Sequence, residues 1–398
     1  MKIYIDRMDH LGNGIGKIND KIVFVPKTLS NENIDINIIE EKKKYCIGKI
    51  NEIITPSAKR INSMCPYFDK CTGCHLRHIS YDDTINFKKE KLENIFLRYL
   101  NIKRDIEVIP GVDNYRNKVK LQIENRKIGY YIENSHTLCE ITSCLNVSKS
   151  INSFISNIYK LDIANGEITI RSNDNDELLI IINTNDKVNL NIKNDFKITG
   201  IVINNKCVFG NSYFINKIND LYFKVSYNSF FQVNNYMNGI LFNILDDYIK
   251  ENEIVLDLYC GVGTLGLSVS RKLNKVIGID ISKSNIMDAI KNAEINKINN
   301  AYYLENDAST AISKIKDNID TLIVDPPRAG LTSMGIKHIF SANPKKIIYI
   351  SCNPMTLVRD LKELLNKYEI ENVIGLDMFP YTYHVECVSV LHRKSLEK

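Results

Sequence analysis

The C-terminal quarter of the chain carries a thiol and two carboxylates at the ends of short apolar segments. Cys352 follows the run IIYIS, Asp325 closes the run TLIVD, and Glu386 begins the run ECVSVLHR. A thiolate is a nucleophile, and a neighbouring carboxylate can take or give a proton. A lone cysteine beside a strand is more often a buried structural residue. A catalytic Cys352 therefore requires partners that the fold must bring to it.

The elements that would position these side chains alternate regularly between strand and helix after about residue 222. Helix candidates lie near residues 236–250, 264–272, 284–296 and 355–367, and strand candidates include EIVLDLY, KVIGID, TLIVD, KIIYIS and ECVSVLHR. Strands separated by helices predict a parallel sheet, whose carboxyl ends form the ligand crevice. We expect an α/β, Rossmann-like domain with Asp325 and Cys352 on strand tips. His384 and Glu386, two residues apart, are expected on one face of the closing strand.

A glycine-rich turn follows the first of these strands, in the string IVLDLYCGVGTLGL of residues 254–267. Gly261 and Gly263 let the backbone approach a ligand, and Asp280 ends the next strand, where a carboxylate can bind the two hydroxyls of a ribose. The pattern D-x-x-C-G-x-G-x-x-x-L resembles motif I of S-adenosylmethionine-dependent methyltransferases and fits the dinucleotide fingerprint less well. We therefore predict that S-adenosyl-L-methionine binds here.

The segment DPPRAGL bears on what is methylated. Two prolines rigidify the loop after Asp325 and aim its carboxylate into the crevice. Methyltransferases that act on exocyclic amino groups place an aromatic ring after the prolines, whereas this chain has Arg328. Carbon 5 of uracil is a weak nucleophile that becomes reactive once a thiolate adds to carbon 6, and a base must then remove the proton on carbon 5. Cys352, Glu386 and Asp325 supply a thiolate, a base and a group to hold the ring.

A second cysteine pattern, CPYFDKCTGCHLRH at residues 65–78, has the spacing of a metal site. Cys65, Cys71 and Cys74 are separated by five and then two residues. Zinc would take a fourth ligand from a nearby histidine, and an iron–sulfur cluster would take a more distant cysteine. The candidates for the fourth ligand are His75, His78, Cys139 and Cys144.

The N-terminal half predicts two further units. Short apolar runs in residues 1–55, separated by turns, predict a small OB-like β-barrel, and this segment resembles a TRAM domain, an RNA-binding barrel. A basic cluster there could follow a phosphate backbone; it comprises Lys42, Lys43, Lys44, Lys49, Lys59 and Arg60. Residues 81–100 show helical periodicity, and residues 105–220 predict a mixed, sheet-rich domain. We expect three units, at residues 1–56, 57–222 and 223–398.

The length, net charge and cysteine count of the chain set broad limits on its fold and function. A chain of 398 residues is long enough for two or three domains. A formal charge of +5 permits nucleic acid as a partner without requiring it. The first residues lack a signal-peptide pattern, and no run of eighteen apolar residues occurs, so we expect a soluble cytoplasmic protein, without a membrane partner and monomeric. Ten cysteines in a reducing compartment favour metal binding or catalysis over disulfides.

Taken together, these motifs resemble the RNA 5-methyluridine (uracil-5-) methyltransferase family. The resemblance rests on DPPRAGL, SCNPMTLVRDL, the terminal HVE, FFQVN at residues 230–234, NYRNK at residues 114–118 and the three-cysteine motif. It implies that Cys352 is the nucleophile and Glu386 the base that removes the proton. The positions that it implies for binding S-adenosylmethionine, together with Gly261 of the turn, are Gln232, Tyr259, Asp280, Asp325 and, less directly, Asp307.

The resemblance also implies a 4Fe-4S cluster held by Cys65, Cys71, Cys74 and Cys144. Cys144 is preferred to Cys139 because its setting, ITSCLNV, matches better. Thr72 and Arg77 depart from the glycine and glutamine that are usual in the family, but neither replaces a ligand. Members with both a TRAM domain and a cluster resemble the branch that acts on 23S ribosomal RNA, so we expect this target.

Three alternatives remain open at this point. Transfer RNA could be the substrate in place of ribosomal RNA. A non-catalytic RNA-binding assembly factor could retain the fold, although it would be expected to lose Cys352 or Glu386, and both are present. A cytosine methyltransferase also uses a cysteine, but within Pro-Cys or Thr-Cys motifs rather than Ser-Cys-Asn-Pro.

Overall fold

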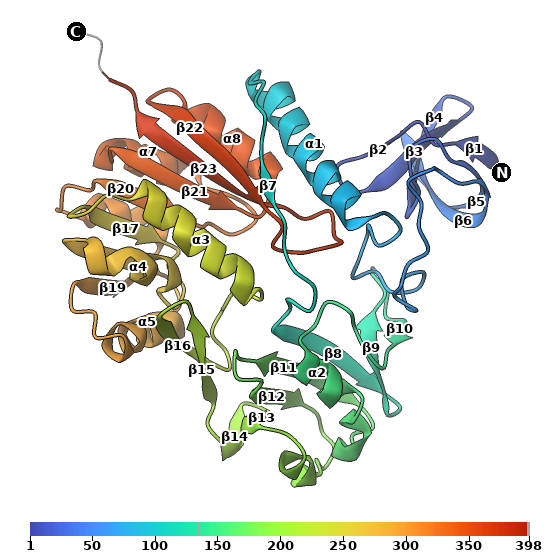
Figure 1. Ribbon diagram of the computed structural model, residues 1–398, viewed down its shortest axis with the longest axis horizontal. Coiled ribbons are helices and arrows are strands. Elements are labelled where there is room, and N and C mark those ends of the chain that lie inside the picture. The colour runs from blue at the N-terminus through green and yellow to red at the C-terminus, as the bar shows by residue number, and fades with distance from the viewer. Residues whose placement is uncertain (134, 396–398) are drawn as a thin grey trace.

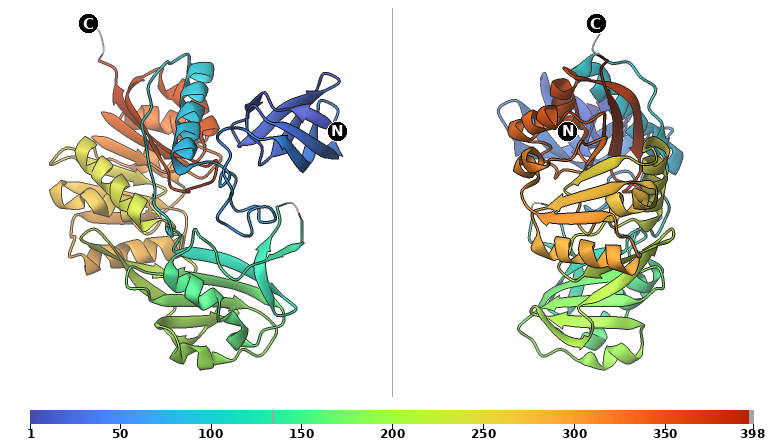
Figure 2. Two further views of the ribbon diagram at one scale, coloured as in Figure 1. Left: turned by 45° about the vertical axis from the view of Figure 1, so that its right-hand side comes forward. Right: turned by 90° about the vertical axis from the view of Figure 1, so that its left-hand side faces the viewer.

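The computed structural model describes residues 1–133 and 135–395. It contains a small N-terminal sheet, a central sheet and a large C-terminal sheet with helices on its faces (Figure 1). Two further views show the N-terminal barrel standing apart from the central sheet, with the cyan helix α1 beside the C-terminal sheet (Figure 2). Within the described residues, no helix combines the length and the apolar content required to cross a bilayer.

The N-terminal sheet closes on itself. Its order is β1-β5-β6-β4-β3-β2. Because β1 pairs with β5 while β2 pairs with β3, the continuous segment 2–8 joins the two edges. Closure protects the edges of these short strands and buries a core that includes Ile5, Val23 and Ile36. The strands are β1 (Lys2–Tyr4), β2 (Arg7–Met8), β3 (Asn13–Ile18), β4 (Lys21–Pro26), β5 (Asn33–Glu41) and β6 (Tyr45–Thr55).

The central sheet has seven strands in the order β10-β9-β8-β11-β12-β13-β14 and packs α2 (Lys149–Ile155) against one face. Its strands are mostly antiparallel, as expected for a mixed, sheet-rich unit. They are β8 (Lys118–Glu124), β9 (Lys127–Tyr131), β10 (Leu138–Glu140), β11 (Gly166–Ser172), β12 (Leu178–Asn183), β13 (Ile198–Ile203) and β14 (Lys206–Gly210). The hairpin β15 (Tyr213–Ile218) and β16 (Leu221–Ser226) leads to the C-terminal sheet.

The C-terminal sheet has eight strands in the order β19-β18-β17-β20-β21-β23-β22-β7. Its first five strands are parallel, as predicted from the β/α alternation. The chain order reverses between β17 and β20, which makes their carboxyl ends the expected ligand crevice. The strands are β17 (Ile254–Leu258), β18 (Lys275–Asp280), β19 (Ala301–Glu305), β20 (Thr321–Val324), β21 (Lys346–Ser351), β22 (Tyr368–Leu376) and β23 (Glu386–Arg393).

Helices cover both faces of this sheet, and their caps follow from the sequence. Asn234 and Asn353 cap α3 and α8 with their side chains, and Pro354 occupies the first turn of α8. The helices are α3 (Asn235–Tyr248), α4 (Thr264–Val269), α5 (Lys283–Ile295), α6 (Ala308–Ala311), α7 (Ser333–Ala342) and α8 (Pro354–Leu364). The four predicted helices are therefore present, with ends shifted by a few residues.

Three details differ from the sequence expectations. The closing strand β23 runs antiparallel to both neighbours, β21 and β22. His384 lies before β23, in a turn where its amide donates to Thr382 Oγ1, so it does not share a strand face with Glu386. Finally, α1 (Tyr81–Leu100) and β7 (Val108–Ile109), which we grouped with the central unit, bury their apolar side chains in the core of the C-terminal sheet.

Candidate functional site

The register of two antiparallel strands places the candidate nucleophile and base side by side. Ser351, the last residue of β21, pairs with Cys387 of β23. Cys352 and Glu386 come next to this last pair on their two chain segments. The Glu386 carboxyl raises the pKa of the Cys352 thiol, so the two side chains lie near each other. Glu386 is only 3% exposed, and Cys352 is half-buried, so the thiol and the carboxyl share a largely desolvated setting.

Asp325 joins this pair from the neighbouring strand. It follows β20 directly, and β20 pairs in parallel with β21. Gln232, in the segment before α3, lies near Asp325 and opposes the rise in its pKa. Burial raises the pKa of Asp325 and, together with the negative charge of Asp325, also raises the pKa of Glu386 well above its ordinary value. Two carboxyls in one desolvated site thus favour sharing a proton.

Arg328 is the cation of this site, and the sequence reasoning did not assign it a role. Burial and the Glu386 carboxyl raise the pKa of the Cys352 thiol, whereas Arg328 lowers it. Arg328 also opposes the rise in the pKa of Glu386. Its carbonyl oxygen accepts hydrogen bonds from Asn353 Nδ2 at 3.1 Å and Thr356 Oγ1 at 3.2 Å. The start of α8 therefore fixes the loop DPPRAGL against the turn that presents Cys352.

The glycine-rich turn after β17 forms the other side of the crevice. Tyr259, Gly261 and Gly263 all have positive φ, at 63°, 54° and 84°. A Cβ on Gly261 would meet nothing within 4 Å, so the space beside this backbone is open to a ligand. A Cβ on Gly263 would lie 2.7 Å from Tyr303 Oη, which excludes a side chain there. This turn needs glycine both for its conformation and for close packing.

The acidic residues around this turn differ in their surroundings. The Asp280 carboxylate accepts hydrogen bonds from the amides of Gly261 at 3.0 Å and Ser282 at 2.8 Å. Asp257 is fully buried, which raises its pKa to about 7; one of its oxygens accepts from the Gly266 amide and the other has no partner in the described chain. Asp307 is exposed and caps α6. Asp280 thus lies next to the turn, whereas the Asp307 carboxylate already accepts a hydrogen bond at the start of α6.

The cysteine-rich segment lies between β6 and α1 and has no regular secondary structure. Burial and, to a smaller extent, Cys139, Cys74 and Cys144 raise the pKa of Cys71 to about 11, so these thiols are neighbours. Cys65 in turn raises the pKa of Cys139. Residues 1–133 and 135–395 nevertheless contain no group of three or more His, Cys, Asp or Glu side chains that could hold a metal ion. The expected cluster therefore stays a prediction.

This segment contacts the loop that leads to Glu386. The amides of His75 and Leu76 both donate to the Tyr381 carbonyl at 3.0 Å. The Arg77 guanidinium lies 4.0 Å from the centre of the Tyr381 ring and also donates to Asn146, whose Nδ2 donates to Cys74 Sγ at 3.2 Å. A continuous set of contacts thus connects the thiols with residues 377–385.

Helix α1 holds the same loop from the other side. Lys88 and Asp377 form an ion pair with no exposed side-chain surface. Tyr81 Oη donates to Asp377 at 2.7 Å, and Lys88 also donates to the Phe379 carbonyl at 3.0 Å. Lys91 donates to the Tyr383 carbonyl at 2.8 Å. The loop before Glu386 is therefore fixed by buried charged groups, which sequence patterns on α1 did not indicate.

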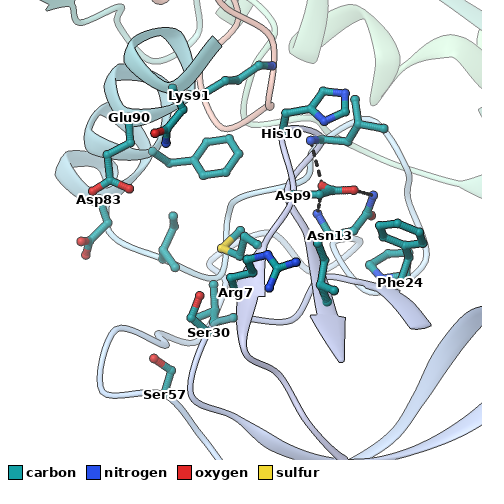
Figure 3. Close-up of a pocket in the computed structure, with 18 of the residues that line it drawn as sticks. Arg7, Asp9, His10, Asn13, Phe24, Ser30, Ser57, Asp83, Glu90 and Lys91 are labelled. Atoms are coloured by element: carbon teal, nitrogen blue, oxygen red, sulfur yellow. Dashed lines mark hydrogen bonds between the residues drawn. The ribbon is translucent and has the colours of Figure 1, made fainter. Parts of the chain in front are cut away.

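A hollow of about 1600 Å³ lies between the barrel and α1 (Figure 3). In the close-up, Arg7 and His10 of the barrel segment stand across from Asp83, Glu90 and Lys91 of α1. The hollow extends to Met355 at the start of α8, but Cys352, Asp325 and Glu386 do not line it. Acidic and basic side chains occur together on its walls, so its charge alone does not favour nucleic acid.

The predicted basic cluster of the barrel is only partly free. Arg60 pairs with the buried Glu32, Lys59 pairs with Asp83 of α1, and Lys42 pairs with Glu40. Arg60 thus holds the linker to the barrel and is not a free surface cation. Lys43, Lys44 and Lys49 are exposed.

Comparisons with known proteins agree with this architecture. A family model described as tRNA (uracil-5-)-methyltransferase matches residues 169–394, and a TRAM domain model matches residues 1–50. A protein from Clostridium tetani named as an uncharacterized RNA methyltransferase is 32% identical over 98% of this chain and 95% of its own length. A similarly named protein from Caldanaerobacter subterraneus subsp. tengcongensis is 33% identical over 98% of both chains.

Among solved structures, the chain is similar to a tRNA (uracil-54, C5)-methyltransferase from Pyrococcus abyssi, crystallised in complex with S-adenosyl-L-homocysteine. The TM-score is 0.82 with 26% sequence identity, and the match covers 98% of this chain and 100% of that one. The similarity therefore includes the barrel, the central sheet and the C-terminal sheet together.

Proposed function

Because the chain belongs to the tRNA (uracil-5-)-methyltransferase family of S-adenosylmethionine-dependent RNA methyltransferases, we propose that it methylates carbon 5 of a uridine in 23S ribosomal RNA through a covalent adduct on Cys352. The observation that supports the mechanism is the pairing of Ser351 with Cys387 at the end of β21 and β23, which brings the adjacent residues Cys352 and Glu386 near each other. The TRAM domain and the three-cysteine motif favour the ribosomal target.

Cys352 acts as the nucleophile. Its thiolate forms a bond to carbon 6 of the uracil ring, and the electron pair released from the 5,6 double bond becomes available at carbon 5. The bound S-adenosylmethionine supplies the electrophilic methyl group that carbon 5 takes up. Glu386 then removes the proton on carbon 5, the double bond re-forms, and the bond between sulfur and carbon 6 breaks.

The electrostatics of the site suit this sequence of steps. The raised pKa of Glu386 makes its carboxylate a stronger base than an exposed glutamate. Arg328 favours both the thiolate and the carboxylate, and these are the forms that the mechanism requires. Asp325, which sits beside both groups, is positioned to hold the uracil ring. We therefore include Arg328 with Cys352, Glu386 and Asp325 in the catalytic site.

The residues around the glycine turn fit S-adenosylmethionine. The open space beside Gly261 and the adjoining Asp280 carboxylate match a ligand with a ribose, as proposed from the sequence. The side chains that we propose to contact it, besides Gly261, are Gln232, Tyr259, Asp280, Asp325 and Asp307. Among these Asp307 has the weakest support, because its carboxylate already caps α6.

We also propose a 4Fe-4S cluster held by Cys65, Cys71, Cys74 and Cys144. Its support is the spacing of the three-cysteine motif, the proximity of Cys144 to Cys71 and Cys74, whose pKa values it raises, and the cysteine ligation that such clusters require. Protein purified without oxygen should contain about four iron atoms per chain, a ratio that elemental analysis measures. Stoichiometric zinc without iron would contradict the assignment.

Transfer RNA is the second candidate substrate, because the Pyrococcus abyssi structure is that of a tRNA methyltransferase and matches this chain over nearly its full length. The two candidates are separated by mapping 5-methyluridine in ribosomal and transfer RNA from cells with and without the gene. Loss of one 23S position supports the proposal. Loss of 5-methyluridine at a tRNA position alone would show that transfer RNA, and not ribosomal RNA, is the substrate. Unchanged 5-methyluridine in both RNAs would overturn both candidates.

A further inference from the structure

Two cations face each other on the central sheet, an arrangement that a sheet normally avoids. Lys118 of β8 pairs directly with Arg171 of β11. Like charges at directly opposed positions destabilise an antiparallel pair. Val119 and Ile170, the alternate residues on these strands, are buried in the core of the central domain, so Lys118 and Arg171 point to the other face of the sheet. An unfavourable pair in this place requires a reason other than folding.

The positive charge here is not neutralised by the protein. Arg116 Nε donates to the Lys118 carbonyl at 2.9 Å, which brings a third cation to the pair. Arg171 is 3% exposed; its Nη2 donates to the Ser229 carbonyl at 2.6 Å, and its Nε has no partner. Within residues 1–133 and 135–395, no carboxylate forms an ion pair with any of the three. Asp288, the acid whose charge acts on Arg171, is already bonded by Lys224 and two serines.

The unfavourable surroundings of Lys118 lower its pKa. Burial, and then the positive charges of Arg171, Arg116 and Lys120, lower the pKa of Lys118 to about 8. Both effects disfavour the charged form, and the negative charge of a bound anion would oppose them. By contrast Lys120, two residues further along the same strand and face, is exposed and pairs with Glu167.

This group of cations is next to the catalytic crevice. Asn117, between Arg116 and Lys118, donates from its backbone amide to the Val233 carbonyl at 2.9 Å and from its side chain to Asn235 at 2.8 Å. Gln232, in the same segment, acts on the pKa of Asp325 and therefore lies near it. In Figure 1, β8 and β11 lie on the side of the central sheet that faces the C-terminal domain. A ligand on these cations would therefore lie beside the uracil that reacts.

We propose that Arg116, Lys118 and Arg171 form an oxyanion site that binds a backbone phosphate of the substrate RNA beside the reacting uridine. This inference rests on the proposed function, since it assigns a part of the same substrate. Guanidinium and ammonium donors without an acidic partner are the groups that bind phosphate in RNA-binding proteins. The carboxylate of S-adenosylmethionine is the other oxyanion within the crevice, and the experiment must separate the two.

The test measures binding rather than turnover, so its result is independent of whether Cys352 is the nucleophile. Lys118→Gln is made in the full chain carrying Cys352→Ala, which prevents covalent capture. The probes are a labelled stem-loop RNA with a uridine in its loop, followed by fluorescence anisotropy across a salt series, and S-adenosyl-L-homocysteine, followed by calorimetry. Lys120→Gln is the matched control, and Lys118→Arg preserves the charge.

Lys118→Gln should weaken RNA binding about tenfold and reduce the salt slope by about one, with unchanged affinity for S-adenosyl-L-homocysteine. Lys118→Arg should restore most of the RNA affinity, and Lys120→Gln should change it little. Unchanged RNA affinity and slope in Lys118→Gln would overturn the proposal. Weaker S-adenosyl-L-homocysteine binding with unchanged RNA affinity would also overturn it and assign the site to the amino-acid carboxylate. The test substitutes Lys118 and not Arg171, because Arg171 is buried in the sheet.

Discussion

The proposed catalytic crevice and the cysteine-rich segment bring reactive side chains together in different ways. In the crevice, Asp325, Cys352 and Glu386 lie at the ends of hydrogen-bonded strands, so the sheet register alone fixes their relative positions. In the cysteine-rich segment, the thiols lie on irregular backbone and do not form a metal-binding group within the described residues. A strand-based site is set by the backbone before any ligand binds, whereas a loop-based site depends on its ligand.

The two regions are nevertheless in contact through residues 377–385. The Tyr381 carbonyl accepts two amide hydrogen bonds from the segment that follows Cys74, and Glu386 comes five residues later. Tyr381 has a positive φ of 62°, which costs a non-glycine residue free energy unless the surroundings hold it. The loop is therefore the place where changes in either region would reach the other.

The largest expected effect comes from removing the proposed nucleophile of the crevice. Cys352→Ala should lower methyl transfer by a factor of about 10⁴ or more, because the variant has no thiol at the position of the proposed nucleophile. Binding of RNA, measured by anisotropy, should change little. Cys207→Ala, at an exposed cysteine, is the control and should retain activity. Normal methylation by Cys352→Ala would contradict the covalent mechanism and remove the distinction between the two regions.

Removing the proposed base should give the next largest effect. Glu386→Gln should slow turnover by about 10²–10⁴-fold, because the proton on carbon 5 can no longer be taken by a carboxylate. The thiol remains, so an RNA adduct that survives denaturing electrophoresis should accumulate in the presence of S-adenosylmethionine. Glu371→Gln, at an exposed glutamate on β22, should not accumulate it. Absence of the adduct in Glu386→Gln would mean that another residue removes the proton.

The contrast between the regions also explains what the sequence could predict. Apolar runs ending in Asp325 and Cys352 identified the strand tips, and the β/α alternation predicted that parallel strand ends meet at one edge. The helix at residues 81–100 was predicted with its observed ends, Tyr81–Leu100. These features depend on local periodicity, which a single sequence contains.

The features that the sequence did not predict depend on distant pairs. Lys88 looks like a surface residue on an amphipathic helix, and only the fold shows that Asp377 meets it. His384 was expected on a strand, but the Thr382 hydroxyl accepts from its amide and forms a turn instead. The sequence groups Arg60 with the basic cluster, whereas in the fold Arg60 forms an ion pair with the buried Glu32 of the barrel. Partners separated by many residues leave no periodic signal.

The third prediction tests the connection between the regions. Lys88→Met should lower the free energy of unfolding by about 3–5 kcal/mol, because it leaves the Asp377 carboxylate buried without its partner. Urea denaturation of the full chain measures this change. Replacing both partners, as Lys88→Met with Asp377→Leu, should recover much of the loss. Lys89→Met, one residue along on the exposed side of α1, should have a far smaller effect. Equal effects of Lys88→Met and Lys89→Met would mean that the buried pair does not hold the loop.

The smallest expected effect separates electrostatics from geometry within the crevice. Arg328 lowers the pKa of Cys352 against the effects of burial and Glu386. Arg328→Gln should therefore raise that pKa further and leave less thiolate at neutral pH, which reduces the rate of adduct formation about tenfold for each unit of pKa change.

The factor by which Arg328→Gln slows adduct formation should be constant at pH values below the wild-type pKa of Cys352. It should shrink as pH rises above it, because the wild-type rate levels off while the variant's rate continues to rise. Single-turnover rates across a pH series measure this, and Arg328→Lys, which retains the charge, should follow the wild type. A loss that is independent of pH up to alkaline conditions would show that Arg328 acts by positioning the substrate and not by stabilising the thiolate.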